Sequence, residues 1–192
     1  MFEFKQKTAG QLSRKVSESG KWLQLSTIKY RANDGIEHLW ECADRVASNG
    51  AVVIIPLLKS RNEVILVRQY RPPVDGFVIE FPAGLIDDGE TAATTAKREL
   101  LEETGYYGSV ISVSNHTYNS PGMSGERTEI AVVEIDEVYH RTNPPIPQLE
   151  GTEDIETFIV KRDNLLTFIQ QAEAAGDGID SKVMAFAIAS KI

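Results

Sequence analysis

The chain has 192 residues, a formal net charge of −8 and one cysteine, Cys42. This length suits one main domain with an appendage better than two full domains. The acidic balance argues against binding to a nucleic-acid backbone, which requires a basic stripe. A lone cysteine excludes an internal disulfide and disfavours a cysteine-based zinc site.

Hydrophobic patterning gives no sign of a membrane protein. The longest apolar run, AVVIIPLL from Ala51 to Leu58, is far shorter than the roughly 20 residues that cross a bilayer. Residues 1–20 contain no apolar core of signal-peptide length. We therefore expect no membrane partner and a cytoplasmic location, with the nucleus as an alternative if the source is eukaryotic.

The N-terminal part of the chain predicts a small antiparallel region. Residues 1–20 show no clear period, but apolar and polar residues alternate from Lys21 to Tyr30 and again after the turn residues Asn33–Gly35. Each strand of this hairpin carries one of the two tryptophans, Trp22 and Trp40. Packing is the usual role of a tryptophan on a half-exposed strand. We assign residues 1–48 to an arm and a β-hairpin.

A second domain is predicted over residues 49–192. The β-branched run AVVIIPLL suits a strand that is buried on both faces. Two further strands, EVILVRQY and GFVIEFPAG, follow across short turns. These strands lead the chain directly to Gly84.

The next element is a helix with an unusual charge distribution. Thr91 is the expected N-cap, and Gly105 stands where a left-handed C-cap is needed. Glu99, Glu102 and Glu103 share one face within an arc of about 100°. Acidic side chains at the C-terminal end of a helix oppose the helix dipole. A solvated acidic face explains most such clusters, and a bound cation is the alternative.

The remainder of the chain adds strands and helices. SVISVSNHTYNSPG and ERTEIAVVEID predict one strand each, and residues 137–154 form a polar, proline-bearing connection typical of a lid or binding loop. IETFIVK predicts another strand. An amphipathic helix capped by Asp163 follows, and IDSKVMAFAIAS predicts a last helix.

The spacing around the acidic helix resembles the Nudix box at every position. The matching residues are Gly84, Glu90, Arg98, Glu99, Leu100, Glu102, Glu103, Gly105 and Tyr106. Carboxylates on such a loop and helix are hard oxygen ligands of the kind that Mg²⁺ prefers. The resemblance implies hydrolysis of a nucleoside diphosphate linked to another group. It also implies an α/β fold of mixed α+β character, an α/β/α sandwich on a mixed sheet.

Further segments resemble the eukaryotic-type ADP-ribose and ADP-sugar pyrophosphatases. Pro121 lies fifteen residues beyond the last position of the box, and QYRPP, VIEFPAGLIDDGE and SPGMS are similar to segments of that subgroup. This likeness covers most of the chain. It implies a homodimer with exchanged N-terminal strands, in which Trp22 and Trp40 clamp an adenine ring across the interface.

The resemblance also implies a metal site. Glu99 and Glu103 would bind metal with the backbone carbonyl of Ala83, and Glu102 would add a ligand or a water-mediated contact. Arg98 would orient these carboxylates within the catalytic group, and Glu90 would support them. Two or three Mg²⁺ ions are implied, with Mn²⁺ as a substitute.

Substrate contacts are assigned by the same likeness. Arg45 and Arg71 would meet the phosphates or the terminal ribose, because a planar guanidinium suits phosphate oxygens. Surface salt bridges are the alternative role for both arginines. Glu80 and Leu85 would line the pocket near the ribose. From the loop after Pro121, Met123 and Ser124 would close it.

The general base is expected on the proline-bearing connection, and Glu153 is our assignment. Its neighbours Glu150, Asp154 and Glu156 are close enough in sequence to remain alternatives. Gly125 and Glu126 replace the asparagine usual in the subgroup, which leaves the choice of terminal sugar open. Hydrolysis of other nucleotide derivatives, such as oxidised nucleotides, and non-catalytic binding of ADP-ribose are the competing functions.

Overall fold

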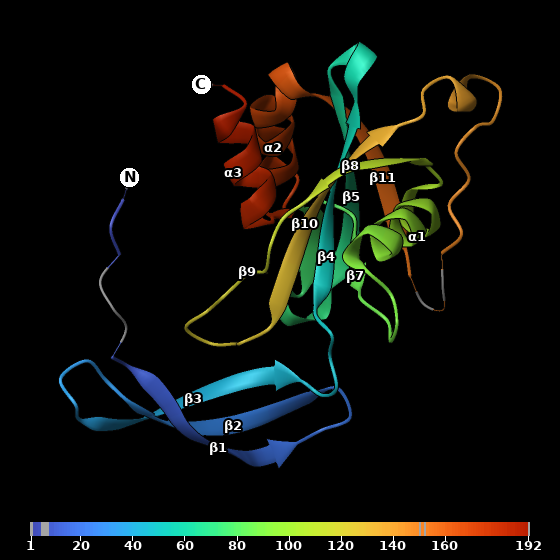
Figure 1. Cartoon of the computed structure of the whole chain (residues 1–192). Coiled ribbons are helices and arrows are strands. Elements are labelled where there is room, and N and C mark those ends of the chain that lie inside the picture. The colour runs from blue at the N-terminus through green and yellow to red at the C-terminus, as the bar shows by residue number, and fades with distance from the viewer. Residues whose placement is uncertain (1, 5–7, 150, 152, 192) are drawn as a thin grey trace. The chain divides into compact units, whose positions relative to one another are not determined.

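The computed structural model describes residues 2–4, 8–149, 151 and 153–191 (Figure 1). Its contacts divide the chain into two compact units. One unit contains the chain up to Asn49 together with the later segment Tyr118–Arg127. The other contains Gly50–Thr117 and the chain from Thr128 onward. The segment Tyr118–Arg127 therefore belongs, by its contacts, to the same unit as the N-terminal strands.

The N-terminal unit is an antiparallel sheet in the order β1-β2-β3. Its strands are β1 (Gly10–Ser19), β2 (Leu23–Arg31) and β3 (Glu37–Arg45). Sequence analysis missed β1, because every residue of this strand is exposed and no buried face imposes an alternation. Trp22 lies just before β2, whereas Trp40 lies within β3.

The larger unit is built on a mixed sheet in the order β12-β6-β5-β4-β10-β8, with β11 paired to β5, β7 to β4 and β9 to β10. The strands are β4 (Ala51–Leu58), β5 (Glu63–Arg71), β6 (Gly76–Glu80), β7 (Ala83–Leu85), β8 (Gly108–Val113), β9 (Thr117–Tyr118), β10 (Arg127–Ile135), β11 (Ile155–Lys161) and β12 (Gly178–Ile179). The helices are α1 (Ala92–Thr104), α2 (Leu165–Ala174) and α3 (Ser181–Ala189), and short 3-10 turns include η1 (Lys59–Arg61), η2 (Pro72–Val74), η3 (Tyr139–Arg141) and η4 (Arg162–Asn164).

Helices cover both faces of this sheet, so the predicted α/β/α sandwich is confirmed (Figure 1). Along β4, Val52 and Ile54 pack toward α1, and Val53 packs toward α2 and α3. A strand buried on both faces needs the continuous apolar run that AVVIIPLL supplies. No helix within the described ranges is long and apolar enough to cross a membrane.

Two local expectations need correction. The segment predicted as one strand ending at Pro121 is divided into β8 and the short β9. Helix α2 is capped by Asn164 and not by Asp163, because the 3-10 turn η4 delays the start of the α-helix.

Helix α1 is fixed to the sheet by its apolar stripe, and this contact can be tested. Leu100 is fully buried in the α1-side core, whereas its neighbour Leu101 is only half-buried. Leu100→Ala should lower the free energy of unfolding by about 2 to 5 kcal/mol, because it removes methyl groups from a close-packed site. Chemical denaturation measures this loss. The matched variant Leu101→Ala should lose clearly less, and an equal loss would contradict the packing described.

Candidate active site

The end of helix α1 carries the acidic cluster on a well-capped framework. The Thr91 hydroxyl accepts a hydrogen bond from the Thr94 N–H at 3.2 Å, which closes the N-terminus. Gly105 has φ +72°, and its N–H donates to the Leu101 carbonyl at 2.8 Å. Both predicted caps are therefore present. They set the last two turns of α1 beside strand β7.

Arg98 lies at the centre of these carboxylates. Its guanidinium donates to Glu90 at 3.1 Å, to Glu99 at 2.9 Å and to Glu102 at 3.0 Å. It also donates to the Leu85 carbonyl at 3.3 Å. The Arg98 hydrogen bonds are the main reason that the pKa of Glu90 is lowered. This network fits the expected orienting role of Arg98.

Glu99 and Glu103 face the chain just before α1. The Glu103 carboxylate accepts the Ala83 N–H at 3.2 Å, and Glu103 is only 6% exposed. A Cβ on Gly84 would lie 1.8 Å from a Glu99 carboxylate oxygen, so a larger residue at position 84 would displace the Glu99 side chain from this position. The structure thus brings together Ala83, Gly84, Glu99 and Glu103.

Burial dominates the electrostatics of the two acids. It raises the pKa of Glu103 to about 8, helped by the negative charge of Glu99. It also raises the pKa of Glu99 to about 7, and the nearby Arg98 opposes that rise. A partly buried and a buried carboxylate that repel each other are stabilised as anions by a cation. The oxygen donor set therefore fits a divalent metal such as Mg²⁺.

The side chains do not already form a closed metal cage. Among the described residues, no three acidic, histidine or cysteine side chains converge closely enough to hold one ion. Arg98 holds oxygens of Glu99 and Glu102 in the arrangement seen. Coordination by either residue would require its carboxylate to exchange that contact for the ion.

The predicted substrate residues of the larger unit lie on the neighbouring strands. Arg71, at the end of β5, donates to Glu80 of β6 at 2.6 Å. The positive charge of Arg71 partly opposes the rise in the pKa of Glu103 that burial causes. Arg71 therefore lies within electrostatic range of that carboxylate. Leu85 ends β7 with its side chain 43% exposed.

The described candidates for the general base differ in their surroundings. Glu153 is exposed, and its negative charge contributes to the raised pKa values of Glu99 and Glu103. Glu156 lies 3.6 Å from Arg68 of β5, and Asp154 is exposed. Glu150 lies outside the described residues. Glu153 is therefore the candidate that the electrostatics associate with the acidic cluster.

In the N-terminal unit, Trp22 and Trp40 are exposed and separate. Trp22 is 68% exposed and Trp40 is 49% exposed. Leu23, next to Trp22, pairs with Arg45, whereas Trp40 pairs with Ile28. The five residue steps from Leu23 to Ile28 along β2 span roughly 17 Å. One copy of the chain therefore does not bring its two tryptophans to opposite faces of a single base.

The loop 120–126 is tied to β3 within the same unit. The Ala43 N–H donates to the Met123 carbonyl at 2.9 Å, and the Trp40 indole donates to the Gly122 carbonyl at 3.0 Å. Asp44 accepts from the Ser124 hydroxyl at 3.2 Å and from the Gly125 N–H at 2.7 Å. Met123 and Ser124 are thus held beside Trp40.

Sequence analysis missed the contacts by which two residues organise this loop. Asp44 is the shared acceptor for the loop, and Glu126 accepts from Arg45 at 2.6 Å. Neither residue belongs to a motif, because both act through contacts about 80 positions apart in the sequence. Arg45 therefore makes the salt bridge that was its alternative role, although its side chain remains 44% exposed.

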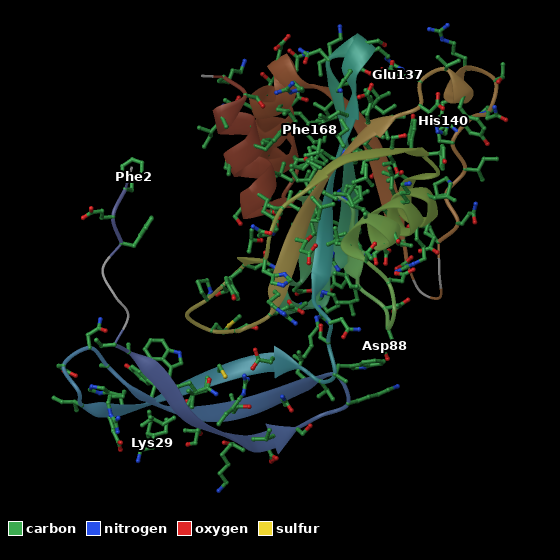
Figure 2. The ribbon with its side chains drawn as sticks, in the orientation of Figure 1. Phe2, Lys29, Asp88, Glu137, His140 and Phe168 are labelled. Atoms are coloured by element: carbon green, nitrogen blue, oxygen red, sulfur yellow. The ribbon has the colours of Figure 1, made fainter. Side chains whose placement is uncertain are left out.

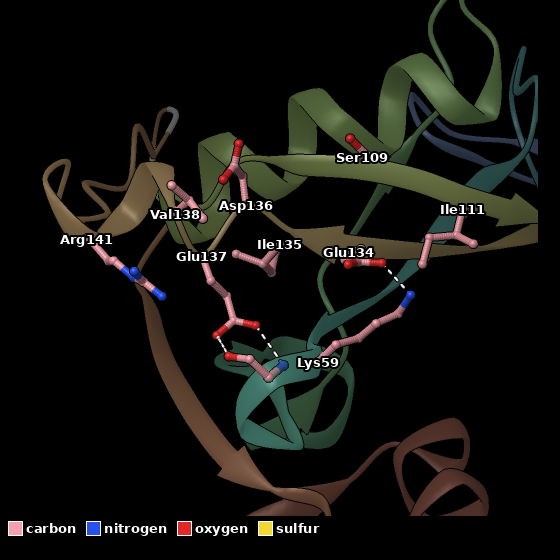
Figure 3. Close-up of a pocket in the computed structure, with 10 residues that line it drawn as sticks. Lys59, Ser109, Ile111, Glu134, Ile135, Asp136, Glu137, Val138 and Arg141 are labelled. Carbon is pink, nitrogen blue, oxygen red and sulfur yellow. Dashed lines mark hydrogen bonds and ion pairs between the residues drawn. The ribbon is translucent and has the colours of Figure 1, made fainter.

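A cavity of about 640 Å³ lies elsewhere, at the ends of β4 and β10 (Figure 3). Within it, Lys59 pairs with Glu134, and Ser60 donates from its N–H and its hydroxyl to Glu137. The charges of Lys59, Glu134 and Glu137 are thus already engaged by partners within the protein and are less available to bind a ligand. We therefore place the candidate active site at the α1 cluster and not in this cavity.

Comparison with known proteins identifies the family. A NUDIX domain model matches residues 48–177 of the chain. The chain belongs to the Nudix family. The predicted resemblance is therefore confirmed, and the chain is a hydrolase by family.

Relatives and a solved structure agree with this assignment. An ADP-ribose pyrophosphatase of Saccharomyces cerevisiae is 38% identical over 181 residues, which cover 89% of this chain and 78% of the yeast protein. An ADP-sugar pyrophosphatase of Mus musculus is 34% identical over 187 residues, covering 93% and 86%. A crystal structure of an ADP compounds hydrolase shares the fold with a TM-score of 0.65 at 18% identity, over 88% of this chain and 86% of that one.

The raised pKa values make stability depend on pH when no metal is bound. Folded Glu103 keeps its proton up to about pH 8, whereas an unfolded glutamate releases it near pH 4.5. The folded state then binds more protons over this interval, so the free energy of unfolding should fall as pH rises. We expect a loss on the order of 2 to 4 kcal/mol between pH 5 and 8 in EDTA. Denaturation at several pH values measures it.

The Glu103→Gln variant should flatten this pH dependence, because glutamine has no proton to lose. Glu173→Gln, on the exposed face of α2, is the matched control and should keep the slope of the parent. Saturating Mg²⁺ should raise the free energy of unfolding of the parent protein at pH 8 above its value in EDTA. An identical slope in the parent and in Glu103→Gln would refute this electrostatic description.

Proposed function

We propose that this Nudix hydrolase cleaves the diphosphate of ADP-ribose to AMP and a sugar phosphate in the presence of Mg²⁺. The proposal is carried by the partly buried Glu99 and the buried Glu103 against Ala83 and Gly84, which form a carboxylate site suited to a divalent cation. The yeast and mouse relatives, named for ADP-ribose and ADP-sugars, support the choice of substrate.

In this proposal, Glu99, Glu103 and the Ala83 carbonyl hold the metal, and Glu102 adds a direct or water-mediated contact. Bound Mg²⁺, in two or three copies or replaced by Mn²⁺, would stabilise negative charge on the diphosphate oxygens. Arg98 fixes the orientation of the carboxylates through its hydrogen bonds with Glu90, Glu99 and Glu102. These residues are the parts of the chain that bind and orient.

Glu153 acts as the general base in this scheme. It removes a proton from the attacking water as the new P–O bond forms, and the P–O bond to the bridging oxygen breaks. The water oxygen remains on one phosphate, and the bridging oxygen leaves with the other. The influence of the Glu153 charge on Glu99 and Glu103 supports this role.

Adenine recognition is proposed to need two copies of the chain. Flat, exposed indoles suit stacking on a base, but Leu23, next to Trp22, lies roughly 17 Å along β2 from Ile28, the partner of Trp40. A clamp with Trp22 from one subunit and Trp40 from the other avoids this distance. A homodimer that exchanges its N-terminal strands supplies that arrangement.

The other substrate residues follow from their positions. Arg71 and Glu80 lie on adjacent strands near the acidic cluster, and Leu85 presents an exposed apolar side chain beside it. Arg45, Met123 and Ser124 belong to the assembly of β3 and the loop 120–126. We propose that Arg45 and Arg71 meet the phosphates or the terminal ribose and that Glu80 and Leu85 line the pocket near the ribose. Met123 and Ser124 are proposed to close the pocket.

The first test measures AMP release from ADP-ribose. The parent should release AMP with Mg²⁺ and not with EDTA. Glu103→Gln should lower kcat/KM by about 100-fold or more, because it removes a charged ligand worth roughly 3 kcal/mol of charge stabilisation. Glu173→Gln should keep parental activity. Binding of ADP-ribose without AMP release would favour a non-catalytic module. Faster turnover of ADP-glucose, GDP-mannose or an 8-oxo-guanine nucleotide would revise the substrate.

The second test concerns the adenine clamp. Trp22→Ala and Trp40→Ala should each raise KM for ADP-ribose by about tenfold, because stacking on a base contributes roughly 1 to 3 kcal/mol. Leu39→Ala removes a neighbouring side chain that is 70% exposed and should leave KM near the parental value.

Co-expression of the two tryptophan variants distinguishes clamps within and between subunits. Random pairing would rebuild an intact clamp in about a quarter of the sites if each clamp uses both subunits. Low-KM activity should then reappear in the mixture. Its absence, with dimers present, would contradict a clamp shared between subunits.

A further inference from the structure

A segment after β10 binds the end of helix α1 at several points, and we call residues 136–148 the strap. At its start, Ser60 donates from its N–H and hydroxyl to Glu137 (Figure 3), and Asp136 accepts the Tyr139 N–H at 2.9 Å. The Asp136 N–H also donates to the Tyr107 carbonyl at 3.0 Å. The strap therefore leaves the sheet in a fixed direction.

His140 ties the middle of the strap to the residues that follow α1 (Figure 2). Its Nε2 accepts the Tyr107 N–H at 2.8 Å, and its ring lies 4.9 Å from that of Tyr106. Because Nε2 accepts, the neutral ring carries its proton on Nδ1 and donates to the Asn143 carbonyl at 2.9 Å. This imidazole bridges two stretches of backbone.

The end of the strap lies directly on the C-terminus of α1. The Gln148 N–H donates to the Glu102 carbonyl at 2.7 Å, which satisfies one of the carbonyls that a helix end leaves open. A Cβ on Gly105 would lie 2.3 Å from the Ile146 nitrogen and 2.5 Å from its carbonyl carbon. The strap backbone therefore occupies the space that any larger residue at position 105 would fill.

These contacts bracket the proposed general base. Gln148 is held on α1, and Ile155 begins β11 by pairing with Gln69 of β5. Glu153 lies between them, and six residues, 149–154, join the two attachment points. Without the attachment at Gln148, the nearest strap contact with its own hydrogen bonds is Asn143, and the joining segment becomes eleven residues long.

We propose that Gly105 and the backbone of Gln148 are positioning elements that hold Glu153 in place relative to the carboxylates of α1. This inference rests on the proposed function, because it assigns Glu153 the role of base. Gly105 then has a second role besides ending α1 with a positive φ. Because it has no side chain, the backbone of the strap can lie against the end of α1.

The expected size of the effect follows from chain geometry. Lengthening the connection from six to eleven residues alone lowers the effective concentration of Glu153 by about 2.5-fold. Misplacement of a reacting group by about 1 Å can cost 100-fold in rate. We therefore expect about a tenfold fall in kcat when the attachment is lost, with KM within twofold of the parent.

Two pairs of variants isolate the attachment. Gly105→Ala introduces the clash with Ile146, whereas Gly176→Ala imposes a similar backbone strain at φ +94° with no atom within 4 Å of the added Cβ. Gly105→Ala should lower kcat about tenfold, and Gly176→Ala should leave it unchanged. Gln148→Pro removes the N–H donor, whereas Gln148→Ala keeps it. The kcat of Gln148→Ala should stay well above that of Gln148→Pro.

A double-mutant cycle tests whether the attachment acts through Glu153. Glu153→Gln should lower kcat strongly with little change in KM, and Gln148→Pro should add less than a twofold further loss in that background. Independent, multiplicative losses would overturn the proposal. An active Glu153→Gln enzyme would overturn it as well, because Glu153 would not be the base.

Hydrogen exchange gives a readout that does not depend on activity. The Gln148 amide should be protected in the parent, and Gly105→Ala should increase exchange across residues 143–149 while α2 exchanges as before. An unprotected Gln148 amide in the parent would overturn the attachment. A parent with protected Gln148 and no hydrolysis of ADP-ribose would instead reject the proposed function and leave the docked strap without a catalytic role, which also overturns this inference.

Discussion

The repulsion between the partly buried Glu99 and the buried Glu103 at the end of α1 is the constraint on which the site depends. Burial, reinforced by neighbouring negative charges, raises the pKa values of both carboxyls. The surrounding groups moderate this cost without removing it, since Arg98 contacts Glu99 and the Ala83 N–H donates to Glu103. The fold thus keeps a charge imbalance that a divalent cation would relieve.

Much of the larger unit could be predicted from sequence because its signals are local. The apolar run of β4, the Thr91 and Gly105 caps and the helical spacing of the carboxylates each depend on a few neighbouring residues. Such patterns translate directly into a buried strand and a capped helix. The spacing of the glycines and carboxylates resembles the Nudix box, and the sandwich architecture was implied by that resemblance.

The rest depended on contacts that the sequence does not display. Strand β1 has no buried face, so it left no alternation to detect. Asp44 and Glu126 acquire their partners only when the loop 120–126 meets β3. The Gln148 and Glu102 contact joins backbone atoms, and backbone atoms carry no residue-specific signal. The roles assigned to individual site residues remain predictions.

The prolines of the strap change how its composition should be interpreted. Pro144, Pro145 and Pro147 suggested a loosely held connection, yet they flank Ile146 where the strap crosses Gly105. Proline restricts the unfolded chain, so ordering this stretch loses less conformational entropy than ordering a glycine-rich loop would. Proline also lacks an N–H, which reduces the number of donors that a chain crossing a helix end must satisfy. The strap is therefore a stiffened connection whose docking is entropically inexpensive.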